Sequence, residues 1–355
     1  MDDLLDLVLS GAPLDTAMAK VRATLHRGDR SLVARAETLV RQDPGMLDAG
    51  LLSVDGVTYR TGSFAAPSIA DLTQACQALR GVGSSRLSYL TGAGLLSDIG
   101  ALQAFASHGT TFQVASQFNC LESPTSAWLV PVADYLHDPT QGPRAAVSAF
   151  PAALLRHYAA PGPDGRFTQA TNAPQLDLLA DVCPGRVRNG YLTFRDAAAA
   201  RDLAAALDAR PDALQVGVAT DAEVVLGADW DGAVAGTPLI TQVFTSTVAG
   251  GMYSDTPLTG AALDACRALL RGAYLGTLLA AASAGRPRVV LTLIGGGVFG
   301  NPVAAIVDAI AWAFDQTADL GLDVILNARQ VIPEQLGPLA DRVHDSGGVV
   351  RHLAG

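Results

Sequence analysis

The chain has 355 residues, of which 49% are hydrophobic and 16% are charged, and its formal net charge is −10 at pH 7. This composition is typical of a globular protein with one large domain and an appendage, or with two small domains. The acidic balance argues against nucleic acid or an anionic membrane as the main partner. A small polyanion is still compatible, because backbone N–H groups at helix N-termini bind anions without lysines.

The N-terminus and the cysteines indicate the compartment. Met1-Asp2-Asp3 is acidic, and the apolar segment of a secretory signal does not follow it. No apolar run is long enough to span a bilayer. The four cysteines are scattered, without the spacing of a zinc site or of a disulfide framework. We therefore expect a cytoplasmic protein without a metal.

The first part of the chain has helical and hairpin patterns. Apolar residues recur with helical spacing over 1–45, and 51–60 alternates around Asp55-Gly56, a two-residue hairpin signal. A further helix is expected at 68–80, before Gly81 and Gly83. These patterns predict an N-terminal helical extension over 1–85.

From residue 111 strands alternate with helices. The pattern predicts a mostly parallel or mixed, buried sheet with helices on both faces, a three-layer α/β/α domain over 86–355. Leu214–Val218 and Val224–Leu226 are expected to pair around Thr220-Asp221, and 161–190 is expected to be irregular. The other predicted strands are 112–117, 192–194, 239–245, 289–294 and 322–326, and the helices are 142–158, 195–208, 258–284 and 302–318, followed by a last helix and strand.

A glycine-rich loop follows the apolar stretch 288–294. Glycines accept φ > 0 and let the backbone approach a ligand closely. Asn301 suits a helix N-cap and Pro302 suits the first helical position, so the loop is expected to end at a helix N-terminus that binds an anion such as pyrophosphate. The ligand-binding residues predicted in this loop are Gly295, Gly296, Gly297, Val298, Phe299 and Gly300.

The loop has two other interpretations. It could be a tight turn without a ligand, or a nicotinamide site, because Gly295, Gly297 and Gly300 match GxGxxG. The acidic residue that usually ends the next strand is replaced here by Asn327, and only 55 residues follow Gly300. The dinucleotide interpretation is therefore disfavoured.

Four segments, at 97–102, 112–119, 141–147 and 295–302, lie in the order in which the macrodomain family carries its ligand-binding motifs. The first resembles the family's Gly-Asp-Ile-Thr motif, in which the aspartate and the following N–H contact adenine. The resemblance thus implies adenine contacts for Asp98 and Ile99. It implies phosphate contacts for Gln141 and Gly142, a ribose contact for Phe299 and a place in the adenine pocket for Asn327.

The resemblance implies a macrodomain-like fold that binds ADP-ribose and needs no cofactor. The segments FQVASQFNCLE and TQGP resemble a divergent branch that includes bacterial effector ADP-ribosyl hydrolases of the MavL type. This branch implies an enzyme that removes ADP-ribose from modified protein, with arginine as the candidate linkage. We expect a monomer whose partners are ADP-ribose and ADP-ribosylated protein.

One position departs from the family. The commonest hydrolase macrodomains carry an aspartate in the first glycine loop that orients a water, and Arg144 stands at the matching position here. Other acids must then activate water or stabilise the positive charge that develops at the anomeric carbon. The candidate catalytic residues are Asn119, Glu122, Asp221 and Asp255, with Glu223, Asp229 and Asp231 near the third of these.

Each candidate also has a structural interpretation. The acids can be solvated surface groups, Asn119 can cap local backbone, and Asp98 can be a helix N-cap. A non-catalytic reader of ADP-ribose would need the same pocket, as would an enzyme acting on free ADP-ribose derivatives. The sequence leaves these alternatives open.

Overall fold

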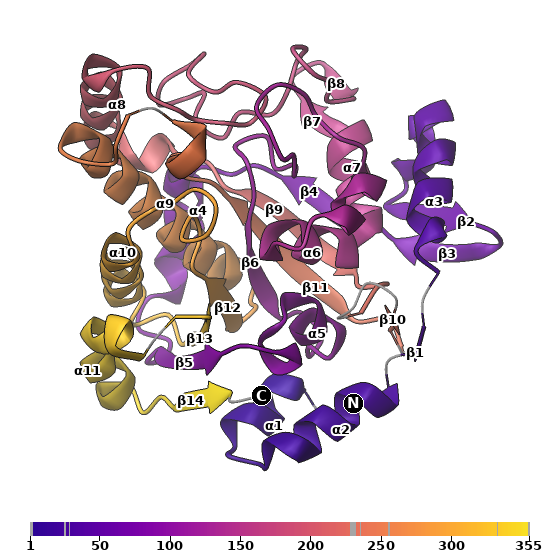
Figure 1. Cartoon of the computed structure of the whole chain (residues 1–355), viewed down its shortest axis with the longest axis horizontal. Helices are drawn as coiled ribbons and strands as arrows, with labels where there is room; N and C mark the ends of the chain where they lie inside the picture. Colours follow the sequence, from indigo (N-terminus) through magenta and orange to yellow (C-terminus); the bar gives the residue numbers. More distant parts are fainter. Residues whose placement is uncertain are drawn as a thin grey trace.

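The computed structural model describes residues 3–24, 26–27, 29–227, 232–234, 236–254, 256–331 and 333–353. An eight-stranded sheet with the order β14-β5-β13-β12-β6-β11-β9-β4 runs through the molecule (Figure 1). The strands from β14 to β11 are parallel, and β9 and β4 continue the sheet in antiparallel pairings. The bounds are β14 Val350–Leu353, β5 Arg86–Gly92, β13 Asp323–Arg329, β12 Arg288–Thr292, β6 Thr111–Ala115, β11 Leu239–Thr245, β9 Gly217–Glu223 and β4 Ser63–Ala65.

Helices cover both faces of the sheet, as Figure 1 shows. On one face α9 packs against α4, α8 and α10, and α10 contacts α11. On the other face α6 packs against α5 and α7. The predicted three-layer α/β/α architecture with a mixed, mostly parallel sheet is therefore confirmed. The bounds are α4 Ile69–Cys76, α5 Ile99–Ala104, α6 Gln141–Ser148, α7 Phe150–Tyr158, α8 Ala197–Ala209, α9 Ala261–Ser283, α10 Val303–Gln316 and α11 Gly337–Asp345.

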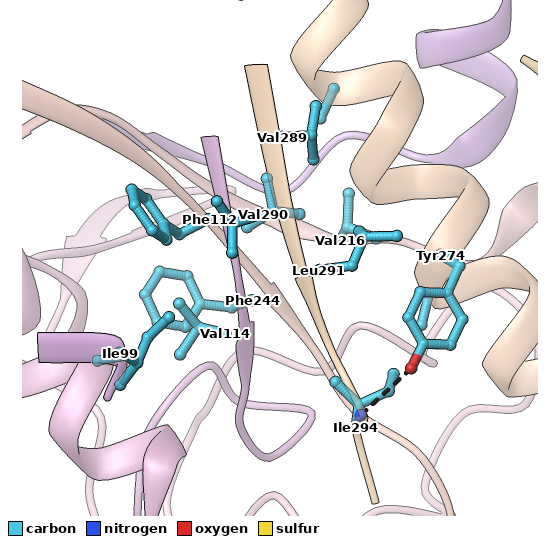
Figure 2. Packing of buried hydrophobic residues seen from close by; sticks show 14 of the residues in the cluster. Ile99, Phe112, Val114, Val216, Phe244, Tyr274, Val289, Val290, Leu291 and Ile294 are labelled. Carbon is cyan, nitrogen blue, oxygen red and sulfur yellow. Dashed lines mark hydrogen bonds between the residues drawn. The ribbon is translucent and has the colours of Figure 1, made fainter. Parts of the chain in front are cut away.

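The central strands are buried on both faces, which explains their continuous apolar sequences. In β12, Val289, Val290 and Leu291 have no exposed surface, and Phe112 of β6 and Phe244 of β11 pack beside them (Figure 2). Each such side chain contributes about 1.5–3 kcal/mol through burial. In the described part of the chain, no helix is long and apolar enough to cross a membrane.

The N-terminal part is less separate than predicted. Helices α1 Leu4–Leu9, α2 Leu14–Thr24 and α3 Ser31–Gln42 and the hairpin of β2 Leu51–Val54 and β3 Val57–Arg60 form as expected. However, β4 is the edge strand of the main sheet, and α4 packs against α9. The predicted boundary at residue 85 was wrong, because this chain segment completes the sheet and one helical layer.

Three local predictions were also wrong. Residues 217–223 form one strand, because β11 supplies hydrogen-bond partners and the positive φ of Asp221 (56°) lies beside a register shift rather than in a reverse turn. Residues 192–194 form no strand in the described chain. The helix predicted at 142–158 breaks at Ala149. Pro151, in the first turn of α7, has no N–H to donate to the preceding turn.

A buried carboxylate joins α3 to the domain. Glu37 is 3% exposed and accepts hydrogen bonds from Tyr158 Oη at 2.6 Å, Val132 N at 2.7 Å and Ala133 N at 2.9 Å. The last two residues begin the 3₁₀ helix η4 Val132–His137. Glu37 therefore fixes the position of η4 from outside the sheet.

We expect Glu37→Ala to lower the free energy of unfolding by about 3–5 kcal/mol, because three buried donors lose their acceptor. Tyr158→Phe removes one of these bonds and should cost about 1 kcal/mol. Denaturant titration measures both, with the exposed Glu334→Ala as a control. A loss below about 1 kcal/mol for Glu37→Ala would show that the carboxylate does not hold η4.

Candidate functional site

A cavity of about 650 Å³ opens at the carboxyl ends of the central parallel strands. In open α/β sheets this edge is where ligands bind, because loops from several strands converge there. The residues that line it include Ser116, Gln117 and Glu122 after β6, Gln141 and Gly142 at the start of α6, Thr245–Thr247 after β11, 292–299 after β12, and Asn327 and Arg329 of β13.

The loop after β12 presents free backbone donors. Within the described residues, the N–H groups of Gly295, Gly297, Val298 and Phe299 make no hydrogen bond. Gly295 has φ +72°, and a Cβ atom on Gly297 would meet nothing within 4 Å. The open side of the loop can thus accept an oxyanion directly on the backbone. Gly295 to Phe299 line the cavity, as predicted, whereas Gly300 does not.

Buried polar groups hold this loop from behind. Asn301 is 3% exposed, and its Oδ1 accepts from Thr247 Oγ1 at 2.8 Å. Its Nδ2 donates to Val248 O and Phe299 O. The predicted N-cap role of Asn301 was wrong, because Pro302 occupies the cap position of α10 and the Asn301 side chain braces the loop to the segment after β11.

A tyrosine fixes the start of the same loop. Tyr274 Oη of α9 donates to Thr292 O at 2.7 Å and accepts from Ile294 N at 3.2 Å. Figure 2 shows this hydroxyl beside the end of β12. Because both partners are backbone groups, the direction in which the chain leaves the strand is set by the helix behind it.

The start of α6 forms the second backbone wall. Gly142 lies so close to β6 that a Cβ atom would be 2.3 Å from Ala115 O and 3.1 Å from Glu122 Oε2. The N–H groups of Gln141 and Gly142 make no hydrogen bond within the described chain. The predicted phosphate contact of this segment therefore has free donors at a helix N-terminus.

An aromatic cluster closes one side of the cavity. Phe299 packs against Tyr191 and Tyr253, with ring centroids 5.7 and 5.5 Å away. All three line the cavity. The two tyrosines were missed in the sequence, because they come from loops whose spatial neighbours follow from the fold alone.

The adenine contacts predicted for Asp98 and Ile99 do not match the geometry. Asp98 caps α5, accepts from Gly100 N at 3.0 Å and pairs with Arg144 Nε at 2.8 Å, and it does not line the cavity. The N–H of Ile99 already donates to Gln141 Oε1 at 2.9 Å. The Asp98 carboxylate and the Ile99 N–H are already bonded to Arg144 and Gln141, and these contacts join α5 to α6.

Asn327 does line the cavity, as predicted. It is 4% exposed, its Nδ2 donates to Ser97 O at 3.0 Å, and its Oδ1 has no hydrogen-bond partner in the described chain. Arg329, which the sequence analysis missed, also lines this end and donates to Gly94 O and Ser97 Oγ. Arg329 lies just after the parallel strand predicted at 322–326, and that position could have marked it as a candidate for the cavity.

Among the candidate catalytic residues that the structure describes, Glu122 is the one that lines the cavity. It is 4% exposed, and its Oε1 has no hydrogen-bond partner within the described residues. Burial raises the pKa of its carboxyl well above the ordinary value of 4.5, the Arg156 charge opposes this, and Asp138 adds to it. Burial therefore favours the protonated form of this carboxyl, which is the form that a general acid needs.

Buried groups hold the backbone at and next to Glu122. The Glu122 N–H donates to Tyr135 Oη at 3.0 Å. Arg156 has no exposed surface, donates from Nε to Cys120 O at 3.1 Å, and lies 3.7 Å above the Phe244 ring. Its Nη1 and Nη2 atoms have no hydrogen-bond partner in the described chain. The carboxyl and a buried cation therefore share one part of the core.

The remaining catalytic candidates are elsewhere. Asn119 Oδ1 accepts from Leu121 N and its Nδ2 donates to Gln175, so it caps local backbone outside the cavity. Asp221 pairs with Arg286 at 2.8 Å, near the amino end of β11 and so at the opposite edge of the sheet. Glu223 accepts from Arg60 N. Asp229, Asp231 and Asp255 lie outside the described residues.

No group of three or more His, Cys, Asp or Glu side chains among the described residues is arranged to hold a metal ion. The four cysteines are free, and three of them are buried.

No model of a protein family matches the sequence. The search of curated proteins found no match. Among solved structures, the chain is similar to poly(ADP-ribose) glycohydrolase from Thermomonospora curvata, with 13% identity, a TM-score of 0.43, and 88% of this chain and 98% of that chain covered. It is also similar to the poly(ADP-ribose) glycohydrolase from Deinococcus radiodurans in complex with ADP-ribose, with 12% identity, a TM-score of 0.45, and coverage of 80% and 95%. At this distance the similarity gives no residue of this chain a role.

The raised pKa of Glu122 predicts how stability depends on pH. The protonated carboxyl is favoured in the folded state, so its contribution is full below 4.5 and is lost as pH rises from there to the folded-state pKa. We expect the melting temperature of Glu122→Gln to rise relative to the wild type as the pH is raised above 4.5.

Calorimetric melts across this pH range measure the difference, with the exposed Glu334→Gln as the control for the charge change. A difference that stays constant with pH would show that Glu122 is ionised in the folded protein throughout the range.

Proposed function

We propose that the protein is an ADP-ribosyl hydrolase that removes ADP-ribose from modified protein. The observation that carries the proposal is the buried Glu122 carboxyl, with Oε1 unpaired, beside Gly142 in a cavity with two stretches of unpaired backbone N–H groups. A phosphate-binding wall and a proton-transfer group in one enclosed space fit cleavage next to a pyrophosphate-bearing sugar.

The cavity suits ADP-ribose in size and chemistry. Its volume of about 650 Å³ is within the range of small-molecule sites. The free N–H groups of the loop after β12 and of the start of α6 can bind the two phosphates. The Phe299 cluster offers an apolar face for a ribose, and Asn327 Oδ1 is an unpaired acceptor for a base at the other end.

The reaction can be written with Glu122 as the only proton carrier. The bond from the anomeric carbon to the amino-acid side chain breaks, its electron pair stays on the leaving atom, and Glu122 protonates that atom. The resulting carboxylate takes a proton from water as the water oxygen bonds to the oxocarbenium-like carbon. The products are ADP-ribose and the free side chain, and Glu122 is protonated again.

The proposal also covers the amino acid to which ADP-ribose is attached. The resemblance of the segments at 112–122 and 140–143 to the MavL-type branch supports arginine-linked ADP-ribose on protein. A reader that binds ADP-ribose without cleaving it shares the same cavity, and release of ADP-ribose from modified protein separates the two functions.

ADP-ribose should bind, and Gly297→Glu should abolish its binding while the fold is kept. The open space at Gly297 accommodates the side chain, and its negative charge would face the pyrophosphate. Calorimetric titration measures binding, with Gly297→Gln as a neutral variant of similar volume that should bind more tightly than Gly297→Glu. Wild-type affinity in a folded Gly297→Glu would show that this loop is not the phosphate site.

Glu122→Gln should lower the turnover of ADP-ribosylated protein by about a hundredfold or more, while ADP-ribose affinity stays within severalfold. The amide keeps the shape of the carboxyl and removes its proton transfer. Glu223→Gln is the matched control, because Glu223 is equally buried at 7% exposure and lies outside the cavity.

Released ADP-ribose is measured on arginine-, glutamate- and serine-linked substrates and on poly(ADP-ribose). If the wild type cleaves none of these but binds ADP-ribose, the reader function replaces the hydrolase. If Glu122→Gln retains full turnover, another acid is the catalytic residue.

A further inference from the structure

A second cavity, of about 430 Å³, lies directly beside the first. Both are lined by Glu122, Ser123 and Asp138, so the Glu122 carboxyl stands where the two spaces meet. The second cavity continues along η4 past Asp134 and His137. A group bonded to a sugar in the first cavity would extend into this space.

The titratable side chains of this space, apart from Tyr135 and one histidine, are acids. Glu122, Asp134 and Asp138 line it, and among the described residues neither lysine nor arginine does. The Oε1 atom of Glu122, a residue that is 4% exposed, has no hydrogen-bond partner in the described chain. A residue that lines this space therefore has a buried, unpaired carboxyl oxygen, and two further acids line the space with it.

The walls are fixed by the protein itself. Glu37 accepts from Val132 N and Ala133 N at the start of η4. At the other end of the wall, Asp138 Oδ1 accepts from Thr140 N at 2.8 Å and from its hydroxyl at 2.7 Å. The acidic side chains are thus presented on a braced segment.

We propose that this second cavity binds the side chain to which ADP-ribose is attached, and that its acidic lining selects a cationic side chain, a guanidinium above all. The inference rests on the proposed hydrolase function, since it assigns the leaving-group side of the same site. A guanidinium offers planar, delocalised donors that match carboxylates. An ester-linked carboxyl group offers only acceptor oxygens to these acids, so it gains no such pairing.

The test compares linkages in one protein. Wild-type kcat/KM is measured on arginine-linked and serine-linked ADP-ribosylated peptides, together with Asp134→Asn and Asp134→Lys. We expect the arginine-to-serine ratio to fall about threefold in Asp134→Asn, because Asp134 is exposed and its charge is screened, and about tenfold or more in Asp134→Lys. Free ADP-ribose should bind all three proteins within about twofold of one another.

Asp208→Asn on the exposed face of α8 makes the same charge change away from both cavities and should leave the ratio unchanged. If the wild type cleaves both linkages and the Asp134 variants change both equally, the selection proposal is overturned while the hydrolase function stands.

A second measurement does not depend on turnover. Agmatine, a free guanidinium compound, is titrated into protein saturated with ADP-ribose and followed by calorimetry. It should bind the wild type and bind Asp134→Lys about tenfold more weakly or not at all. Absence of agmatine binding to the wild type overturns the cation subsite, whatever the enzyme cleaves.

Discussion

The parallel alignment of the strands from β14 to β11 is the constraint on which the site depends. Parallel pairing brings the carboxyl ends of β6, β11, β12 and β13 to one edge, so the loops that follow them converge there. These strands are buried on both faces and can be displaced only at the cost of the core. The cavity is therefore a consequence of strand direction, and its backbone donors need no lysine to attract an anion in an acidic protein.

The electrostatics of the site follow from burial. A carboxyl at 4% exposure loses hydration, which raises the pKa of Glu122, and the Arg156 charge in the same part of the core limits that rise. No hydrogen bond joins the two side chains in the described chain, so Glu122 Oε1 and both Nη atoms of Arg156 are buried without a partner. Such incomplete pairing is costly in a core and is common where proteins carry function.

The N-terminal segment takes part in the site at a distance. Through Glu37 it holds η4, and η4 carries Asp134 and His137 at the second cavity. Tyr135 of the same 3₁₀ helix accepts from the Glu122 N–H. One chain segment therefore positions both the acid and the wall beside it, which gives the N-terminal helices a role that a detachable appendage would not have.

The sequence by itself determined the elements and one loop. Apolar runs such as Val289–Leu291 and the glycines from 295 predicted a buried strand and an anion site, because strand burial and glycine φ are local properties. It also picked out Glu122, Gln141, Gly142 and Asn327, which line the cavity. Only the tertiary structure decided that Asp98 and Asn119 are occupied by neighbouring backbone and side-chain groups. It also decided that Asp221 lies at the opposite edge and that β4 completes the sheet. Those outcomes depend on which segments meet in space, and residue spacing along the chain does not encode that for a polar side chain.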